Sequence, residues 1–297
     1  MRTVIVQQGD ALALPMADNF IDAVVCDPPY GIEFMGNEWD GWSTPNAYQE
    51  WCRQWATEAL RVLKPGGYML AFGGTRTYHR LTSGVEDAGF EIRDSITWLY
   101  GSGMPKGKNA LKPASEPIVV ARKPFKGTVA ANVEAYGTGG LNIDASRVPY
   151  TDDVDMSATQ VNFDAMGYGG ATNSDGVQTY KPGGRWPANV VIDDGVAEDL
   201  GEVARYFPVF KYQAKAPKRE RPVVNGVAHP TVKPLELIQW LVRLVTPTDG
   251  IVLDMFAGSG TTGQAANLEG FGAWLIEREP SYIPLIHSRL NLPNEGK

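Results

Sequence analysis

The feature that most restricts how this chain can fold is a glycine-rich turn between an apolar segment and a helix-like segment. Residues 251–254 are apolar up to Asp254, Gly258 and Gly260 follow, and residues 261–268 are compatible with a helix. A glycine-rich turn between a strand and a helix is typical of βαβ units that bind nucleotides, because glycines allow a ligand to approach the backbone. The amides at the start of the helix would then face a carboxylate or a phosphate.

The remaining pattern indicates an α/β protein with a mainly parallel sheet, because strands alternate with helices along the chain. Between residues 125 and 225 the periodicity is lost and glycine is frequent, which predicts an irregular, loop-rich insert. We therefore divide the chain into residues 1–124, the insert at residues 125–225, and residues 226–297. The predicted strands are residues 3–7, 20–26, 68–72, 91–100, 118–121, 251–254 and 273–277, and the predicted helices are residues 48–63, 235–245 and 261–268.

The composition is that of a globular protein. The 297 residues are 43% hydrophobic and 21% charged, which excludes a disordered chain, a collagen and a coiled coil. No apolar run approaches the roughly 18 residues of a membrane span, and the N-terminus lacks a signal-peptide core, so a cytoplasmic location is expected. The two cysteines, Cys26 and Cys52, are too few for a disulfide framework or a four-thiolate zinc site, and no metal is expected.

The chain has a net charge of −7 but contains two strongly basic segments. Residues 102–126 contain six Lys or Arg residues and one acidic residue, and residues 205–221 have the same balance. Basic segments that flank an insert suit contacts with nucleic-acid phosphates, although such runs are more often solvated surface. The candidate contacts are Lys106, Lys108, Lys112, Lys215, Lys218, Arg219 and Arg221.

A second motif, Asp-Pro-Pro-Tyr at residues 27–30 (the DPPY motif), follows a segment with the composition of a buried strand. An aromatic amino group is a weak nucleophile because its lone pair is delocalised into the ring, so a site that uses one needs acceptors for its hydrogens. The Asp27 carboxylate and the Pro28 carbonyl are such acceptors, and the Tyr30 ring can stack on a base extruded from a duplex. Taken alone, the motif is equally consistent with a proline-stiffened turn.

Together, the two motifs resemble those of DNA amino-methyltransferases of the beta arrangement, in which the catalytic DPPY motif comes first and the cofactor-binding FxGxG motif last. The resemblance covers about residues 3–122 and 205–290, and residues 101–107 and 215–221 also look like those of phage and prophage members. It implies a Rossmann-like S-adenosylmethionine-dependent methyltransferase fold with an irregular inserted target-recognition region. Four further matches stand in the expected order, at residues 8–10, 63–67, 229–234 and 277–282.

The resemblance implies S-adenosyl-L-methionine as the cofactor. Asp10 would contact its adenine and Glu277 its ribose, while Lys233 would lie near its carboxylate. The expected cofactor-binding residues are Asp10, Ala11, Thr231, Lys233, Asp254, Phe256, Gly258, Ser259, Gly260, Thr261 and Glu277. The expected catalytic residues are Asp27, Pro28, Pro29 and Tyr30.

The activity that the resemblance implies is site-specific transfer of methyl to the N6 amino group of adenine in DNA, after base flipping. Adenine is preferred to cytosine N4 because Asp27 begins the motif, whereas members acting on cytosine more often begin with serine. The absence of a Pro-Cys pair argues against carbon-5 methylation, which needs a cysteine nucleophile. Double-stranded DNA is the expected partner, restriction–modification the expected setting, and family members are often homodimers.

Three other hypotheses remain open. Methyltransferases of RNA or of protein glutamine use a related Pro-Pro-Tyr turn, but they generally place the glycine-rich segment before it. A DNA-binding module without catalysis is another alternative, although every recognisable chemical position is intact. A nucleotide-dependent oxidoreductase would account for the glycine turn but would leave the DPPY motif unexplained.

Overall fold

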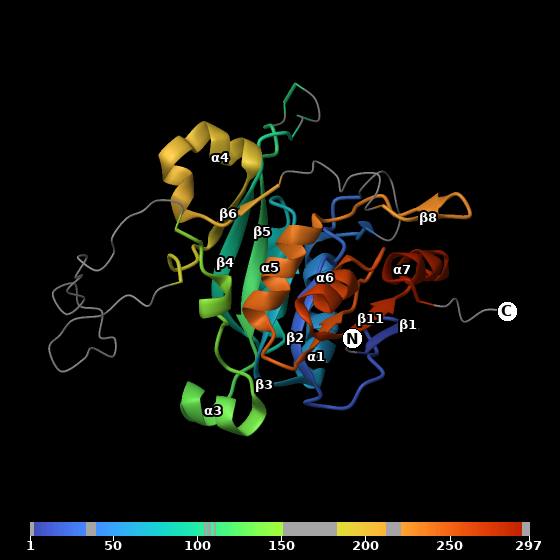
Figure 1. Cartoon of the computed structure of the whole chain (residues 1–297). Helices are drawn as coiled ribbons and strands as arrows, with labels where there is room; N and C mark the ends of the chain where they lie inside the picture. Colours follow the sequence, from blue (N-terminus) through green and yellow to red (C-terminus); the bar gives the residue numbers. More distant parts are fainter. Residues whose placement is uncertain are drawn as a thin grey trace, which may run out of the picture.

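The computed structural model describes residues 3–33, 40–103, 105, 108–109, 111–150, 183–211 and 221–292. Within these residues, nine strands form one sheet in the order β1-β11-β10-β2-β3-β5-β4-β6-β7 (Figure 1). Their bounds are β1 Val4–Gln8, β2 Ile21–Cys26, β3 Leu63–Phe72, β4 Glu91–Leu99, β5 Ser115–Arg122, β6 Val190–Asp193, β7 Val209–Phe210, β10 Ile251–Asp254 and β11 Gly272–Glu277. A separate hairpin consists of β8 (Val223–Val224) and β9 (Val227–Ala228).

The sheet is mainly parallel, as the sequence predicts. Only β5 runs antiparallel to its neighbours β3 and β4 among the strand pairs of this described sheet. From the adjacent strands β10 and β2, the chain proceeds to β11 on one side and to β3 on the other. The carboxyl ends of β10 and β2 therefore form a topological switch point, which is where open α/β sheets bind ligands.

Helices cover both faces of the sheet, and β2 is buried along its whole length. Ala23 and Val25 pack on one face with α5 (Leu235–Val245) and α6 (Thr261–Glu269), whereas Val24 and Cys26 pack on the other face with α1 (Pro45–Val62) and α2 (Tyr78–Asp87). This division follows from the alternation of side chains along a strand. The helices are α1 Pro45–Val62, α2 Tyr78–Asp87, α3 Val129–Tyr136, α4 Asp194–Leu200, α5 Leu235–Val245, α6 Thr261–Glu269 and α7 Ile283–Leu290.

The described part of residues 125–225 contains regular elements that the sequence pattern does not reveal. Strand β6 pairs in parallel with β4 and extends the sheet, and α4 follows it directly. Helix α3 lies between the N-cap Thr128 and the left-handed Gly137. These elements are too short for a periodic pattern to stand out against a glycine-rich background. Helix α2, outside this region, is also absent from the predicted elements.

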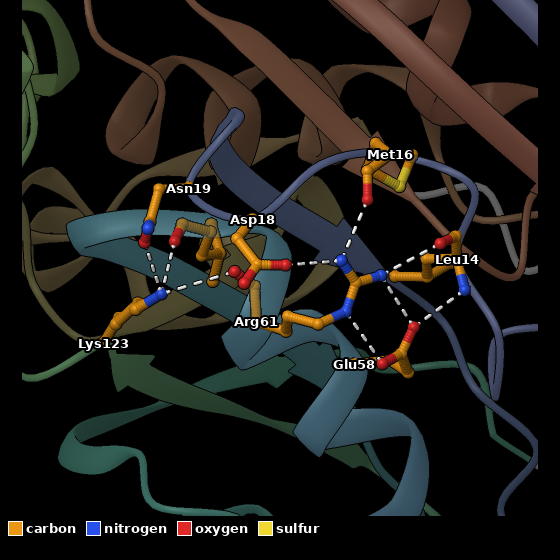
Figure 2. A network of polar contacts seen from close by, with 8 residues as sticks. Leu14, Met16, Asp18, Asn19, Glu58, Arg61 and Lys123 are labelled. Carbon is orange, nitrogen blue, oxygen red and sulfur yellow. Dashed lines mark hydrogen bonds and ion pairs between the residues drawn. The ribbon is translucent and has the colours of Figure 1, made fainter.

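A polar network fixes the loop between β1 and β2 to the end of α1 (Figure 2). The Arg61 guanidinium donates to the carboxylates of Glu58 and Asp18 and to the carbonyls of Leu14 and Met16. Residues 10–12, near the start of this loop, line the cavity described below. The network therefore helps to set the position of one wall of that cavity, from the opposite end of the loop.

Candidate active site

A cavity of about 900 Å³ lies at the carboxyl ends of β10 and β2. The residues that line it come from both ends of the chain, so the fold brings together the two motifs that the sequence separates. The lining includes all four residues of the DPPY motif and every expected cofactor-binding residue except Gly260. The structure thus gathers the predicted catalytic and cofactor-binding residues around one space.

The backbone of the DPPY motif and of the two residues after it is held by side chains that the sequence did not single out. The buried Asp40 carboxylate accepts hydrogen bonds from the amides of Gly31 and Ile32, at 2.7 and 3.2 Å. The Tyr48 hydroxyl of α1 donates to the Pro29 carbonyl at 2.9 Å. Burial raises the pKa of Tyr48, so this hydroxyl keeps its proton. These contacts fix the position of the turn within the fold.

Asp27, Tyr30, Glu116 and Lys233 form a charged cluster in the cavity, which we call the lysine cluster. The Lys233 ammonium lies 2.6 Å from Asp27 Oδ2, 2.9 Å from Tyr30 Oη and 3.3 Å from Glu116 Oε2. Tyr30 Oη is also 2.9 Å from Asp27 Oδ1 and 3.0 Å from Glu116 Oε2. A hydroxyl carries one hydrogen, so Tyr30 accepts from Lys233 and donates to one carboxylate at a time.

The environment keeps Lys233 charged and Tyr30 neutral. Burial lowers the pKa of Lys233, but the carboxylates of Asp27 and Glu116 outweigh this effect and raise it. Burial raises the pKa of Tyr30, and the same two carboxylates raise it further. With both carboxylates ionised, the lysine cluster carries two negative charges and one positive charge, and it presents oxygen acceptors to the cavity.

The glycine turn after β10 is bonded to the end of β11. Gly258 has a φ of +53° and its amide donates to Glu277 Oε2 at 2.7 Å. The other Glu277 oxygen accepts from the amide of Glu279 at 2.8 Å, and burial raises the pKa of Glu277. A Cβ atom at residue 258 would lie 2.9 Å from Nε2 of His229, so the turn requires glycine here.

Asp254 lies beneath this turn with its carboxylate nearly inaccessible to solvent. It accepts hydrogen bonds from the Thr262 hydroxyl at 2.6 Å and from the Phe256 amide at 3.0 Å. Burial nevertheless raises the pKa of Asp254 to about 7. A carboxyl group with this pKa changes its charge within the physiological range, so its interaction with a cationic ligand depends on pH.

Aromatic rings form an apolar wall of the cavity. Phe256, Trp51 and Trp42 line it, with 5.8 Å between the ring centroids of Phe256 and Trp51 and 4.7 Å between those of Trp42 and Trp51. The fully buried Trp55 packs against Phe256, with 5.5 Å between the ring centroids. The apolar face of an aromatic side chain suits an adenine ring, and the Glu277 and Asp254 carboxylates suit ribose hydroxyls and a positive charge. These residues therefore fit S-adenosyl-L-methionine.

The structure gives Lys233 a different neighbour from the one that the resemblance implies. The expected place of Lys233 is near the cofactor carboxylate, whereas its ammonium contacts Asp27 of the DPPY motif. Glu116, Asp40, Tyr48 and Thr77 were missed from the sequence; the Thr77 hydroxyl donates to the Tyr30 carbonyl at 2.5 Å. For Glu116 a signal existed, because it is the one acidic residue in the basic segment at residues 102–126.

The expected DNA contacts are only partly described. Lys108 and Lys112 are exposed, and Lys112 donates to the carbonyl of Gly101. Arg221 is half-buried beside the β8–β9 hairpin. The other expected contacts, Lys106, Lys215, Lys218 and Arg219, lie outside the described residues. Across the helices that the structure describes, none is long and apolar enough to cross a membrane.

The strand order and the cavity define a Rossmann-like α/β fold with a ligand site at its topological switch point. The family model described as DNA methylase, covering N6 and N4 methyltransferases, matches residues 21–288, and the chain belongs to this family. It is thus an S-adenosylmethionine-dependent DNA methyltransferase.

Individual relatives agree with this assignment. The Type II methyltransferase M.HindIII of Haemophilus influenzae is 26% identical over 309 aligned residues, covering 84% of this chain and 82% of that protein. The structure of the PvuII DNA methyltransferase (cytosine-N4-specific) is similar with a TM-score of 0.62 at 18% identity, over 99% of this chain and 89% of that one. The M1.HpyAVI–SAM complex has a TM-score of 0.55 at 19% identity, over 98% and 100%. These structures share the fold.

Proposed function

We propose that the protein methylates the N6 amino group of adenine at a specific site in DNA, after the base has left the duplex. The observation that carries the proposal is the Asp27 carboxylate, which lines the cavity at the end of β2 with its side chain 28% exposed. An ionised carboxylate can accept hydrogen bonds but cannot donate one. The exocyclic amino group is the donor on the Watson–Crick edge of adenine, so it is the group that this carboxylate can bind.

The chemistry follows from the weak nucleophilicity of that amino group. When bound, S-adenosyl-L-methionine supplies a methyl group on a positively charged sulfur. Asp27 and the Pro28 carbonyl accept the amino hydrogens, which favours a pyramidal nitrogen with a localised lone pair. As the nitrogen–carbon bond forms, the carbon–sulfur bond would break and its electron pair would stay on the sulfur, which would leave as a neutral thioether. The nitrogen loses one proton, and Asp27 is placed to accept it. The Tyr30 ring, fixed through its hydroxyl and its carbonyl, offers a face on which the base can stack.

The cofactor is assigned to the other side of the cavity. We assign its ribose to Glu277, its adenine to the wall that includes Phe256 and to Asp10, and its cationic part to Asp254. Thr231, Ser259 and Thr261 also line this side of the cavity. Gly258 and Gly260 give the turn its left-handed backbone, with φ angles of +53° and +82°.

Cytosine N4 is the second candidate target, and a structural neighbour favours it. The PvuII enzyme, similar in fold over almost the whole chain, is cytosine-N4-specific. The same acceptors would serve the N4 amino group, because cytosine also presents an amino donor on its Watson–Crick edge. The phosphate contacts that we assign to Lys108, Lys112 and Arg221 do not distinguish the two bases.

The decisive experiment identifies the methylated nucleoside. The protein is incubated with methyl-labelled S-adenosyl-L-methionine and unmethylated duplex DNA, and the DNA is digested to nucleosides. We expect labelled N6-methyladenine, absent with Asp27→Ala and present with the control Asp87→Ala, whose residue is exposed on α2. Labelled N4-methylcytosine would retain the mechanism and change the base. A wild-type protein that binds the cofactor but labels neither base would overturn the proposal.

A further inference from the structure

Glu116 reaches the cavity because β5 runs against the direction of its neighbours. Phe72, the last residue of β3, pairs with Ile118, near the start of β5, and the Gly73 amide donates to the Pro117 carbonyl at 2.9 Å. Parallel strands bring their last residues to the ligand-binding edge of a sheet, so an antiparallel strand brings its first ones. Strand β5 thereby brings Ser115 and the carboxylate of Glu116 to the cavity.

The contacts of Glu116 are with the two groups that also contact Asp27. Its Oε2 atom lies 3.0 Å from Tyr30 Oη and 3.3 Å from Lys233 Nζ. Its side chain is 24% exposed and that of Lys233 is 12% exposed, so water screens these charges incompletely. Every hydrogen-bond donor that reaches Asp27 in the lysine cluster thus has a second acceptor in Glu116.

This arrangement bears on how Asp27 receives a substrate. Each Asp27 oxygen has a donor, with Tyr30 on Oδ1 and Lys233 on Oδ2. An ammonium is a stronger donor than an aromatic amino group, so Lys233 competes with the target base for the carboxylate. A second carboxylate beside Lys233 weakens that competition, because the ammonium can stay paired when a base approaches Asp27.

We propose that Glu116 is a positioning residue for methyl transfer, which holds the Lys233 ammonium and the Tyr30 hydroxyl so that Asp27 can accept the amino hydrogens of the target base. The inference rests on the proposed role of Asp27 and holds for adenine and cytosine alike. Glu116 acts through Lys233 and Tyr30. Without it, Lys233 pairs with Asp27 alone, and the base must displace the ammonium.

The first test is Glu116→Gln, which keeps the shape of the side chain and removes its charge. We expect kcat for DNA methylation to fall about tenfold or more, the order of one hydrogen bond to a charged group. The Kd for S-adenosyl-L-methionine should stay within about twofold, since Glu116 is assigned no cofactor contact. The control is Glu86→Gln, at an exposed position on α2. Unchanged kcat in Glu116→Gln would overturn the inference.

The second test asks whether Glu116 acts through Lys233. Lys233→Met leaves two carboxylates without their cation, and adding Glu116→Gln removes one of them. We therefore expect the double variant to have a higher kcat than Lys233→Met alone. If the fold losses of kcat in the two single variants multiply in the double variant, the two residues act independently, and this result would contradict the inference. If Glu116→Gln lowers the melting temperature strongly, Glu116→Asp, which keeps the charge, should recover most of the kcat.

These results are separable from the test of the proposed function. If the wild-type protein methylates neither base, the proposed function fails first. If it methylates either amino group and Glu116→Gln does so at the same rate, only the role of Glu116 fails.

Discussion

The ammonium group of Lys233 lies 2.6 Å from a carboxylate oxygen of Asp27, although 206 residues separate the two in the sequence. The lysine belongs to the segment between β9 and α5, and the aspartate follows β2. The contact therefore joins the C-terminal part of the chain to the DPPY motif of the N-terminal part. A charged pair of this kind forms only when both parts are folded together.

Replacing Lys233 tests whether this lysine acts on Asp27, which its ammonium contacts, or on the cofactor carboxylate, as the resemblance implies. We expect Lys233→Met to lower kcat about tenfold or more, because Asp27 and Glu116 lose their shared counter-charge. The Kd for S-adenosyl-L-methionine should rise by less than about threefold, measured by titration calorimetry. A large rise in Kd with little change in kcat would instead place Lys233 at the cofactor carboxylate.

Cofactor binding should strengthen with rising pH through the pKa of Asp254. Burial raises the pKa of this carboxyl to about 7, so it is mostly protonated at pH 6 and mostly ionised at pH 8. The ionised form attracts the positive charge of the cofactor, so Kd should be lower at pH 8 by several-fold. Equilibrium dialysis at both pH values checks this. In Asp254→Asn the ratio of the two Kd values should approach one, and an unaltered ratio would refute the assignment.

Alanine substitutions at two glycines with left-handed backbone conformations distinguish an effect on stability from an effect on cofactor binding. Gly258 and Gly270 have φ angles of +53° and +81°, but only at Gly258 would a Cβ meet another residue, His229. Gly270→Ala should lower the free energy of unfolding by about 1 kcal/mol, and Gly258→Ala should lower it by more, because its Cβ also meets His229. Only Gly258→Ala should also raise the Kd for the cofactor, by about tenfold, because the contact of its Cβ with His229 would shift the turn whose amide bonds Glu277. Equal effects on Kd in the two variants would argue against this function of the turn.

The Arg61 network should matter for stability more than a similar ion pair on the same helix. Arg61→Ala leaves the carbonyls of Leu14 and Met16 without their donor, and we expect the free energy of unfolding to fall by about 2 kcal/mol. Arg53 forms the same i,i+3 pair with Glu50 but is solvent-exposed, so Arg53→Ala should leave stability unchanged. Urea denaturation of both variants gives the comparison, and equal losses would show that the network adds nothing.

Much of the architecture could be predicted because its signals are local. Apolar strands before Asp27 and Asp254 and the glycines after β10 determine the class of fold and the edge of the sheet that carries the site. The charge pattern distinguishes Glu116, but its place beside Asp27 could not be predicted, because it depends on β5 running antiparallel, which the residues of that strand do not encode locally. The pairing of Lys233 with Asp27 has the same cause: it depends on strand order, not on spacing.

The pairing of β1 with β11 brings the beginning and the end of the described fold side by side, and α7 also packs on β1 (Figure 1). A circularly permuted chain, with these two ends linked and the backbone opened within the insert, would read its glycine turn first and its DPPY motif second. The same strands would still lie next to each other, and the same cavity would form between them. The order of the two motifs along the chain thus depends on where in the fold the termini lie. The chemistry of the site depends instead on which strand ends are neighbours in the sheet.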